Sequence, residues 1–447
     1  MDRGAVAIVS EHPTGLPKGV ASIVVADIRG VLAEVSRKFY GEPERDLELV
    51  GITGTNGKTT VAYLVQHLLA AREGPVGMLG TVKYDLGGRT LPAFRTTPES
   101  VDIYAMLAQM RSSGCRRAVL EVSSHGLEQR RLGGIPFKVG VFLNLTRDHL
   151  DYHGSMEAYY EAKKRMFVGG CYRGPEIAIV NLDDPFGARL ASDLAGAPSR
   201  LVTFGERPDA DYRVFDVRLG AAGSSFSIAY EGRSIRVNSG LPGRYNVSNT
   251  LAAFAVGNAL DGDGARLAAG IGSFQGVEGR MERVEAGPDI HVFVDYAHTD
   301  NALGNALSML RTITEGRLLV VFGCGGNRDR TKRPLMTAAA LRHGDFVWAT
   351  ADNPRSESVT AIFDDMRSGL EDVARIRFVE DRRRAISLAL DEARAGDCVL
   401  IAGKGHETFQ EFEDTVVPFD DRLTARELLD IKWPPTASGP RLVQRPE

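Results

Sequence analysis

The chain has 447 residues, of which 43% are hydrophobic and 25% charged, and this ordinary balance predicts a globular protein of two or three domains. The formal net charge of −4 gives no general attraction to nucleic acids or membranes, so we expect neither as a partner. Four scattered cysteines without a CxxC pair argue against a disulfide framework or a structural zinc site. No apolar run approaches the roughly 20 residues that span a bilayer, and we expect a cytoplasmic, monomeric protein.

Residues 1–46 carry too few apolar positions to build a core of their own. They contain one short apolar run, from Ala5 to Val9, and then a helix. One stripe of that helix is apolar and consists of Ile28, Val31, Leu32, Val35 and Phe39. We expect this segment to be a truncated N-terminal domain that leans on the next one.

Residues 47–65 read as a strand, a glycine-rich loop and a helix. LELVGIT (47–53) is apolar and β-branched, as in a buried strand, and helical spacing of apolar residues follows the loop. The loop GTNGKTT (54–60) would then lie at a helix N-terminus, where backbone N–H groups and the helix dipole attract phosphate. Lys58 would reach the β and γ phosphates, and Thr59 would hold Mg²⁺. The strict P-loop motif has glycine at the position of Ile52. The alternative is therefore a tight turn between strand and helix in which the lysine is incidental.

Strand-like and helical segments alternate from residue 47 to about 285. RRAVLEV, KVGVFLNL and EIAIVNL predict buried strands of a mostly parallel sheet with crossover helices. Residues 200–240 change character, because RVFDVRL, SSFSIAY and RSIRVNS alternate with period two and predict inserted antiparallel strands. A helix follows in GRYNVSNTLAAFAVGNAL.

A second α/β domain is predicted after a linker at EAGPD (285–289). Its strands would be DIHVFVDY, RLLVVFG, DFVWAT, RIRFVE and DCVLIAG. The pattern predicts a Rossmann-like, doubly wound domain over residues 286–432, after a P-loop central domain over 47–285. GCGGNRD lacks the spacing of a dinucleotide fingerprint. Residues 433–447 read as a disordered tail.

Polar side chains follow two strands of the central domain. Glu121 ends one strand, and a carboxylate at the carboxyl edge of a sheet beside a P-loop is suited to hold Mg²⁺. The loop at residues 144–154 gathers Asp148, His149, Asp151 and His153, a density that suggests ligand or metal contacts. The alternatives are a solvated polar cluster at Glu121 and helix capping by Asp148 or Asp151.

Lys163 and Lys164 lie in the predicted helix SMEAYYEAKKRMF. From the residues alone, both are read as surface lysines, because lysine is rarely buried without a partner.

Ten motifs in chain order give the sequence a specific resemblance to a known family. They are GITGTNGKTT, RTTPESVD, EVSSHGLEQRRL, NLTRDHLDYHGSMEAYYEAKKRMF, GRYNVSNTLAA, GRMERV, VDYAHT, GCGGNRDRTKRPLM, DNPRSE and GKGHE. With these motifs the chain resembles the Mur ligases, the ATP-dependent amide-bond enzymes of peptidoglycan synthesis. Within the family it is similar to members that add meso-2,6-diaminopimelate to a UDP-linked muramoyl dipeptide.

The resemblance implies ATP and Mg²⁺ as cofactors and assigns roles to individual residues. The catalytic residues would be Lys58, Glu121, His149 and Lys163, and the metal would be held by Thr59, Glu121 and Lys163, the last as a carbamate. ATP would be bound by Gly54, Thr55, Asn56, Gly57, Lys58, Thr59, Thr60, Asn246, Asn249, Asp295, Tyr296 and His298.

Two further groups would bind the substrates that are joined. The acceptor peptide would contact Thr96, Thr97, Ser123, Gln129 and Arg131. The incoming amino acid would be surrounded by Arg328, Asp352, Asn353, Arg355, Gly403 and Glu407. For Arg355, the structural alternative is that it only holds a loop through an ion pair, for example to Glu357.

The N-terminal segment departs from the family pattern, since the P-loop is reached after only 50 residues. Two other functions therefore stay open. One is a Mur-type ligase that acts on a smaller or non-UDP acceptor, and the other is a P-loop nucleotide-binding module without ligase activity.

Overall fold

The computed structural model describes residues 5–13, 15–16, 18–168, 172–284, 290–370 and 373–434. The linker expected at 285–289 and residues 435–447 of the expected tail lie outside the described residues. None of the helices in the described ranges is long and apolar enough to cross a membrane.

The chain divides into two compact units, residues 1–276 and 277–447. This division comes earlier in the chain than the boundary that the sequence suggested near residue 285. The reason is strand β14 (Glu282–Val284), which pairs antiparallel with β15 (His291–Asp295) and so belongs to the second sheet.

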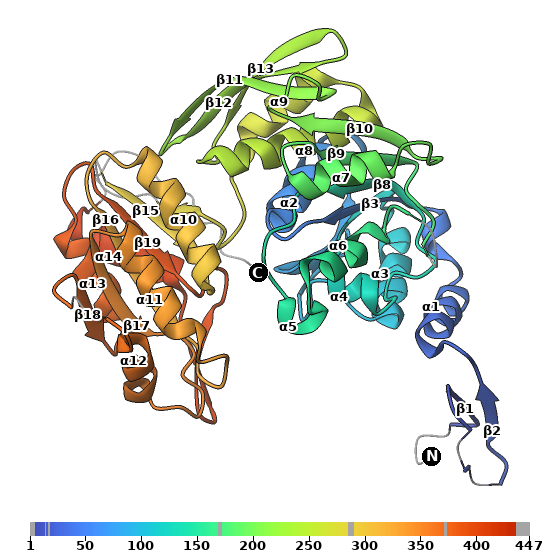
Figure 1. The fold of residues 1–447 in the computed structure, drawn as a ribbon, viewed down its shortest axis with the longest axis horizontal. Coiled ribbons are helices and arrows are strands. Elements are labelled where there is room, and N and C mark those ends of the chain that lie inside the picture. Colours follow the sequence, from blue (N-terminus) through green and yellow to red (C-terminus); the bar gives the residue numbers. More distant parts are fainter. Residues whose placement is uncertain are drawn as a thin grey trace. The chain divides into compact units, whose positions relative to one another are not determined.

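The first unit is built on one sheet of eleven strands (Figure 1). In hydrogen-bonded order its strands are β13 (Arg233–Ser239), β12 (Gly223–Tyr230), β11 (Tyr212–Gly220), β10 (Arg200–Gly205), β9 (Ile177–Asn181), β8 (Phe137–Phe142), β3 (Glu48–Thr53), β7 (Arg117–Glu121), β4 (Val76–Leu79), β5 (Lys83–Asp85) and β6 (Thr90–Pro92). The strands from β11 to β4 pair in parallel, as predicted. The predicted antiparallel strands are confirmed, and they extend the same sheet through β11, β12 and β13.

Strand β3 lies between β7 and β8, so the loop that follows it leaves the sheet among parallel neighbours. The helices of this unit are α2 (Lys58–Glu73), α3 (Ser100–Ser112), α4 (Ser124–Glu128), α5 (Leu150–His153), α6 (Met156–Lys164), α7 (Pro185–Asp193), α8 (Arg244–Asp261) and α9 (Gly264–Ser273). Helix α2 packs against α8 and α9, and α4 packs against α6. The strand ends that meet at β3, β7 and β8 carry the polar residues described below.

The N-terminal segment forms a parallel pair, β1 (Ala7–Ser10) and β2 (Ala21–Val24), then α1 (Ile28–Phe39) and a short 3-10 helix, η1 (Pro43–Arg45). The helix was predicted correctly, but its packing face was not. Small residues of α1, Ala33 and Ser36, are buried where it packs on α3. Leu32, Val35 and Phe39 of the predicted stripe are exposed.

The second unit has a six-stranded sheet, in the order β14, β15, β19 (Cys398–Ala402), β16 (Leu318–Cys324), β17 (Phe346–Ala351) and β18 (Ile376–Val379). All neighbours except β14 and β15 pair in parallel. A small hairpin, β20 (Phe409–Phe412) and β21 (Thr415–Pro418), follows β19.

Helices cover both faces of this second sheet. Apolar residues of α10 (Asp300–Ile313), α11 (Lys332–His343) and α12 (Val359–Arg367) share one core cluster with Leu318 and Val320. Those of α13 (Arg382–Glu392) and α14 (Asp421–Lys432) share another cluster with Leu319 and Val321. Successive side chains of β16 thus point to opposite faces, and the doubly wound prediction is confirmed.

Candidate active site

The loop after β3 is held at the N-terminus of α2. Gly57 is the N-cap residue and has φ of 88°, in the left-handed region that glycine tolerates. The backbone nitrogen of Asn56 donates to Oδ1 of Asn144 at 2.9 Å, and Asn144 Nδ2 donates to the Asn56 carbonyl at 3.1 Å. A Cβ at Gly54 would lie only 2.9 Å from its nearest neighbour. The predicted P-loop is therefore a fixed loop at a helix N-terminus, the geometry that binds phosphate.

Side chains of the loop and of the first turn of α2 make further polar contacts that hold the loop in place. Nζ of Lys58 donates to the carbonyl oxygens of Gly54 and Thr55 at 2.8 and 2.9 Å. The Thr55 hydroxyl lies 3.1 Å from the hydroxyl of Tyr159, on α6. Thr59 is buried and Thr60 follows it in the same turn of α2.

Glu121 lies at the end of β7, buried and surrounded by hydroxyl groups. Its Oε2 accepts from the hydroxyls of Thr59 and Thr81, both at 2.9 Å, and its Oε1 accepts from the backbone nitrogen of Thr81 at 2.8 Å. Its backbone carbonyl accepts from the Thr97 hydroxyl at 2.8 Å. These contacts hold the carboxylate beside the first turn of α2, so it is not a solvated strand end.

The residues assigned to the acceptor form one connected group beside Glu121. The Thr96 hydroxyl is 3.1 Å from that of Thr81, and Thr97 Oγ1 accepts from the Ser123 nitrogen at 3.0 Å. Arg131 donates from Nη1 to the Thr97 carbonyl at 2.8 Å and from Nη2 to Oε1 of Gln129 at 2.6 Å. The structure thus brings all five assigned residues together.

Histidines and tyrosines gather next to this group. The ring of His125 lies 4.9 Å from that of His149, 4.2 Å from that of Tyr152 and 5.5 Å from that of His153. His153 Nε2 is 2.9 Å from the hydroxyl of Ser124. Burial and the neighbouring imidazoles lower the pKa of His125, which favours its neutral form.

The loop at 144–154 contains the short helix α5, whose N-cap residue is His149. No side chain caps α5: the Asp148 carboxylate accepts from the backbone nitrogen of His149 at 2.9 Å, one residue away, and Asp151 lies in the first turn. Capping by the aspartates therefore does not explain why polar residues crowd this loop.

Lys163 is buried, with 1% of its surface exposed, which overturns its interpretation as a surface lysine. Its Nζ donates to the Gly54 carbonyl at 3.0 Å and lies 3.4 Å from the Thr53 hydroxyl and 4.9 Å from the centre of the Tyr159 ring. Burial, and next the positive charge of Lys58, lower the pKa of Lys163 well below its usual value. Lys164, one residue later on α6, forms a surface ion pair with Asp193 at 2.8 Å.

Asn246 and Asn249 are buried on successive turns of α8. Nδ2 of Asn249 donates to Oδ1 of Asn246 at 3.1 Å, and Nδ2 of Asn246 donates to the Pro242 carbonyl at 2.8 Å. Oδ1 of Asn249 occupies the space that a side chain at Gly57 would need. The pair therefore lies directly against the P-loop.

In the second unit, Asp295 ends β15 and is followed by an aromatic cluster. Asp295 Oδ2 accepts from the Met281 nitrogen at 2.6 Å, and burial raises the pKa of this carboxyl group. The centre of the Tyr296 ring lies 4.5 Å from that of His298 and 5.0 Å from that of His406. The Arg280 guanidinium lies 4.9 Å from the centre of the Tyr296 ring. A cationic and aromatic surface of this kind is suited to the base or phosphates of a nucleotide.

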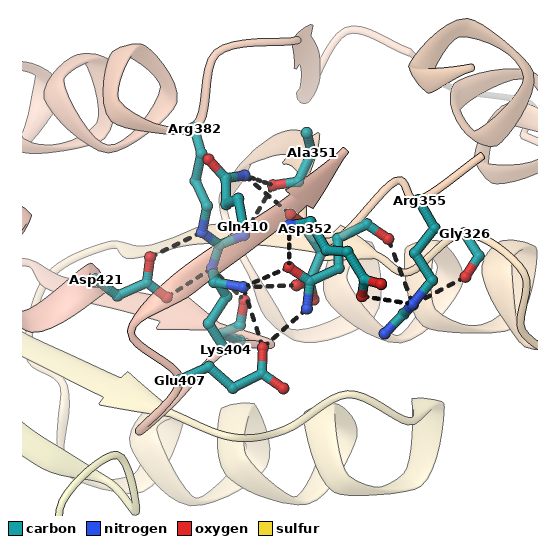
Figure 2. Close-up of polar contacts among 12 residues, drawn as sticks. Gly326, Ala351, Asp352, Arg355, Arg382, Lys404, Glu407, Gln410 and Asp421 are labelled. Carbon is teal, nitrogen blue, oxygen red and sulfur yellow. Dashed lines mark hydrogen bonds and ion pairs between the residues drawn. The ribbon is translucent and has the colours of Figure 1, made fainter. Parts of the chain in front are cut away.

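The residues assigned to the amino acid, apart from Arg328 in the loop after β16, follow the carboxyl ends of β17 and β19. Figure 2 shows Asp352, Arg355 and Glu407 among them. A buried ammonium, that of Lys404, joins them: its Nζ donates to Asp352 Oδ1 at 3.3 Å, Asn353 Oδ1 at 2.9 Å and Glu407 Oε2 at 3.0 Å. Gly403 has φ of 116°, and a Cβ there would lie 2.9 Å from Asp352 Oδ2. Glycine is thus required for the close approach of the Asp352 carboxylate.

Arg355 lies beside this cluster, in the left-handed region at φ of 53°. Its Nε forms an ion pair with Glu411 Oε2 at 2.9 Å, and its Nη1 donates to the Gly326 carbonyl at 2.9 Å. The suggested ion pair with Glu357 is wrong, because that carboxylate is paired with the buried Arg333 at 2.9 Å.

Arg328 lies in the same loop as Gly326. A Cβ at Gly325 would lie 3.2 Å from Nη1 of Arg355 and 3.7 Å from Cγ of Arg328. The two arginines that the resemblance assigns to the amino acid therefore approach one glycine-rich turn.

Several residues that shape these sites were missed by the sequence analysis. Periodicity in the sequence does not predict the contacts of Thr81, Lys404 and Glu411. Lys404 does, however, lie within the motif GKGHE. Arg382 and Asp421 form a pair at 2.7 Å with 0% of either side chain exposed. Arg382, shown with Asp421 in Figure 2, also donates to the carbonyls of Ala351 and Ala402, the last residues of β17 and β19, and so holds these strand ends together.

The described residues contain no group of three or more His, Cys, Asp or Glu side chains able to hold a metal ion. Magnesium that is shared with nucleotide phosphates needs only one or two protein oxygens. The Thr59 hydroxyl and the Glu121 carboxylate, 2.9 Å apart at the P-loop, provide such oxygens. The residues present therefore fit a magnesium ion that is bound together with a nucleotide.

Comparison with known proteins agrees with this geometry. The Mur ligase middle domain matches residues 52–257, and the Mur ligase glutamate ligase domain matches residues 279–405. A UDP-N-acetylmuramoyl-L-alanyl-D-glutamate–2,6-diaminopimelate ligase of Solibacter usitatus is 44% identical over 430 residues, covering 96% of this chain and 86% of the relative. A ligase of the same name from Geobacter metallireducens is 44% identical over 441 residues, covering 94% and 86%.

Solved structures give the same result. A structure of a ligase of that name has a TM-score of 0.71 at 36% identity, covering 96% of this chain and 88% of the other. The folylpolyglutamate synthase of Mycobacterium tuberculosis, complexed with ADP and AMPPCP, has a TM-score of 0.66 at 21% identity, covering 84% of this chain and 92% of the other. At this identity the match shows a similar fold alone. The chain belongs to the Mur ligase family.

Proposed function

We propose that this protein is an ATP-dependent ligase that adds meso-2,6-diaminopimelate to UDP-N-acetylmuramoyl-L-alanyl-D-glutamate. The identity of 44% to relatives of that name over most of both chains supports the substrates. The main structural support for ATP-dependent phosphoryl transfer is the contact of Thr59 with Glu121, beside Lys58 at the start of α2. We further propose that it works as a monomer, in the cytoplasm where ATP is available.

The proposed chemistry proceeds in two steps. An oxygen of the γ-carboxylate of the D-glutamyl residue attacks the γ-phosphorus of ATP, the bond to the bridging oxygen breaks, and ADP leaves. The product is an acyl phosphate. A carboxylate is a poor electrophile, but the acyl phosphate carries phosphate as a good leaving group. The amine of diaminopimelate then attacks the acyl carbon, phosphate leaves, the nitrogen loses a proton, and the amide remains.

The residues of the first unit would stabilise the phosphoryl transfer. The P-loop N–H groups and Lys58 would bind the phosphates and offset their developing charge. Magnesium, when bound at Thr59 and Glu121, supplies further charge neutralisation at the phosphates. Thr97, Ser123 and Arg131 would hold the acceptor beside Glu121, to which Thr97 is hydrogen-bonded.

The nitrogen nucleophile would come from the second unit. The cluster of Asp352, Asn353, Arg355 and Glu407 would bind diaminopimelate, and Asp295, Tyr296 and His298 would contact the nucleotide. This polar cluster disfavours a nucleotide-binding module without ligase activity, because such a module needs no amino-acid site.

The direct test is ADP formation with each substrate omitted in turn. The proposal expects sustained formation of ADP and phosphate only when ATP, the UDP-linked dipeptide and diaminopimelate are all present, and expects Lys58→Ala to abolish turnover. AMP and pyrophosphate as stoichiometric products would refute it, as would sustained ADP formation without an acceptor.

A further inference from the structure

Lys404 is a buried ammonium at the carboxyl end of β19, and 0% of its side chain is exposed. An ammonium group has three N–H donors. Its three side-chain acceptors, Asp352, Asn353 and Glu407, lie within 2.9 to 3.3 Å of Nζ. Figure 2 shows Asp352 and Glu407, from two separate segments of the chain, both directed toward Lys404 Nζ.

The cluster fixes one oxygen of Glu407 and leaves the other available. Oε2 accepts from Lys404 Nζ and from Asn353 Nδ2, both at 3.0 Å. The orientation of the Asn353 amide is set in turn, because its Oδ1 accepts from Lys404 and from the Glu411 nitrogen at 3.1 Å. Within the described ranges, Oε1 of Glu407 accepts no hydrogen bond, and 23% of this side chain is exposed. Oε1 therefore keeps its capacity to accept a hydrogen bond from a ligand.

Charge gives the cluster a preference for a cation. Two carboxylates, Asp352 and Glu407, and one ammonium, Lys404, leave a net charge of about −1. Without Lys404 the two carboxylates would repel each other and would lose the partner that fixes their positions. With Lys404, a single ligand ammonium completes the charge balance.

We propose that Lys404 is a positioning residue that holds Asp352, Asn353 and Glu407 as one acceptor surface for the distal ammonium of the incoming amino acid. Lys404 thereby sets the preference for a substrate with a second amino group. This inference rests on the function proposed above, and it adds a residue that governs how the substrate is selected.

The test uses Lys404→Met in the full chain, because methionine keeps the volume of the stem and removes the charge. Two substrates are compared: meso-diaminopimelate and 2-aminopimelate, which has both carboxylates but lacks the distal amino group. We expect the wild type to prefer diaminopimelate strongly. In Lys404→Met, KM for diaminopimelate should rise by about 30-fold or more, with little change in kcat or in KM for ATP. The preference over 2-aminopimelate should largely disappear.

A matched control is Lys432→Met, at the end of α14 in the same unit, whose Nζ donates to the Leu390 carbonyl. It should leave both KM values unchanged. Thermal melting of each variant shows whether it is folded. If Lys404→Met does not fold, Lys404→Gln, which keeps an N–H donor but lacks the charge, is measured against the same expectations.

Three results would overturn the inference. One is a folded variant that keeps the wild-type KM and preference. Another is a KM that rises equally for both amino acids, which would indicate only a structural role. If the wild type itself fails to use diaminopimelate, the proposed function is wrong and the inference falls with it. That last case is recognised in the wild type alone, before any variant is compared.

Discussion

The Nζ atoms of Lys58 and Lys163 donate to the same acceptor, the backbone carbonyl oxygen of Gly54, at 2.8 and 3.0 Å. The two lysines come from α2 and α6 and meet at the P-loop. Lys163 is removed from water, and a second positive charge, that of Lys58, lies close enough to repel a charge on it. Both effects lower the pKa of Lys163 and favour its neutral amine, the form that can add carbon dioxide.

If Lys163 acts as a carbamate, Lys163→Ala should lose most of the ligase activity. Short carboxylic acids added to the variant should restore part of it, because a carboxylate can take the place of the carbamate oxygens. The matched control is Lys164→Ala, one residue later on α6 and paired at the surface with Asp193. Normal turnover by Lys163→Ala would return this lysine to a structural role.

The same lysine should make stability depend on pH. Folding lowers the pKa of Lys163, so between its folded value and the unfolded value of about 10.4 the unfolded chain binds more protons. The free energy of unfolding should therefore rise with pH in this range, by at most about 1.4 kcal/mol per pH unit from this group. Lys163→Met lacks this contribution and should be more stable than the wild type at neutral pH.

Urea unfolding in buffer free of carbon dioxide, followed across this pH range, measures the difference. The buffer matters because a carbamate would add its own dependence on pH. Parallel curves for the wild type and Lys163→Met would show that the buried amine does not change its protonation on folding.

Thr81 should control metal affinity although it is not an assigned ligand. Its hydroxyl and backbone nitrogen bind the two oxygens of Glu121, at 2.9 and 2.8 Å. Removing a partner that orients a metal ligand typically costs about 10- to 100-fold in metal affinity. Thr81→Val should therefore raise the Mg²⁺ concentration for half-maximal activity by about that factor, while Thr90→Val, on the exposed β6, should not. An unchanged Mg²⁺ dependence in Thr81→Val would contradict this role for Thr81.

Arg355 should favour diaminopimelate over L-lysine. A guanidinium can bind the distal carboxylate of diaminopimelate through two hydrogen bonds, whereas the distal end of L-lysine would bring a second cation close to it. Losing such a pair costs about 2–5 kcal/mol, or roughly 30- to several-thousand-fold in selectivity. Arg355→Ala should raise KM for diaminopimelate far more than KM for ATP.

The ion pair of Arg355 with Glu411 supplies the comparison. Glu411→Gln keeps a hydrogen-bond acceptor for Arg355 and should retain most of the preference for diaminopimelate. The assignment would have to be withdrawn if the wild type used L-lysine equally well, or if Arg355→Ala kept the wild-type preference.

Local patterns in the sequence predicted much of this structure. The β-branched run before Gly54, the glycines and the helical spacing after Lys58 all favour the same strand, loop and helix, so the P-loop was found from a few neighbouring residues. The period-two alternation of residues 213–239 likewise identified the antiparallel strands, because alternation reports directly on a sheet with two different faces.

Contacts between distant segments could not be predicted in this way. Lys163 reads as a surface lysine because its burial depends on how α6 packs against the end of β3, and nothing in its neighbours shows this. Arg382 and Asp421 are far apart in sequence and meet only when α13 and α14 cover the second sheet. The packing face predicted for α1 from its apolar stripe was wrong for a related reason. The small residues Ala33 and Ser36 form the face that packs.

The central claim is that the phosphate of ATP passes to a carboxylate before the amide forms. The most direct measurement places a heavy-oxygen label in the γ-carboxylate of the D-glutamyl residue and analyses the products of complete turnover by mass spectrometry. Formation of an acyl phosphate requires one labelled oxygen to leave with the phosphate in each turnover, and the other to remain in the new amide. Phosphate free of the label, formed together with the tripeptide product, would contradict the account.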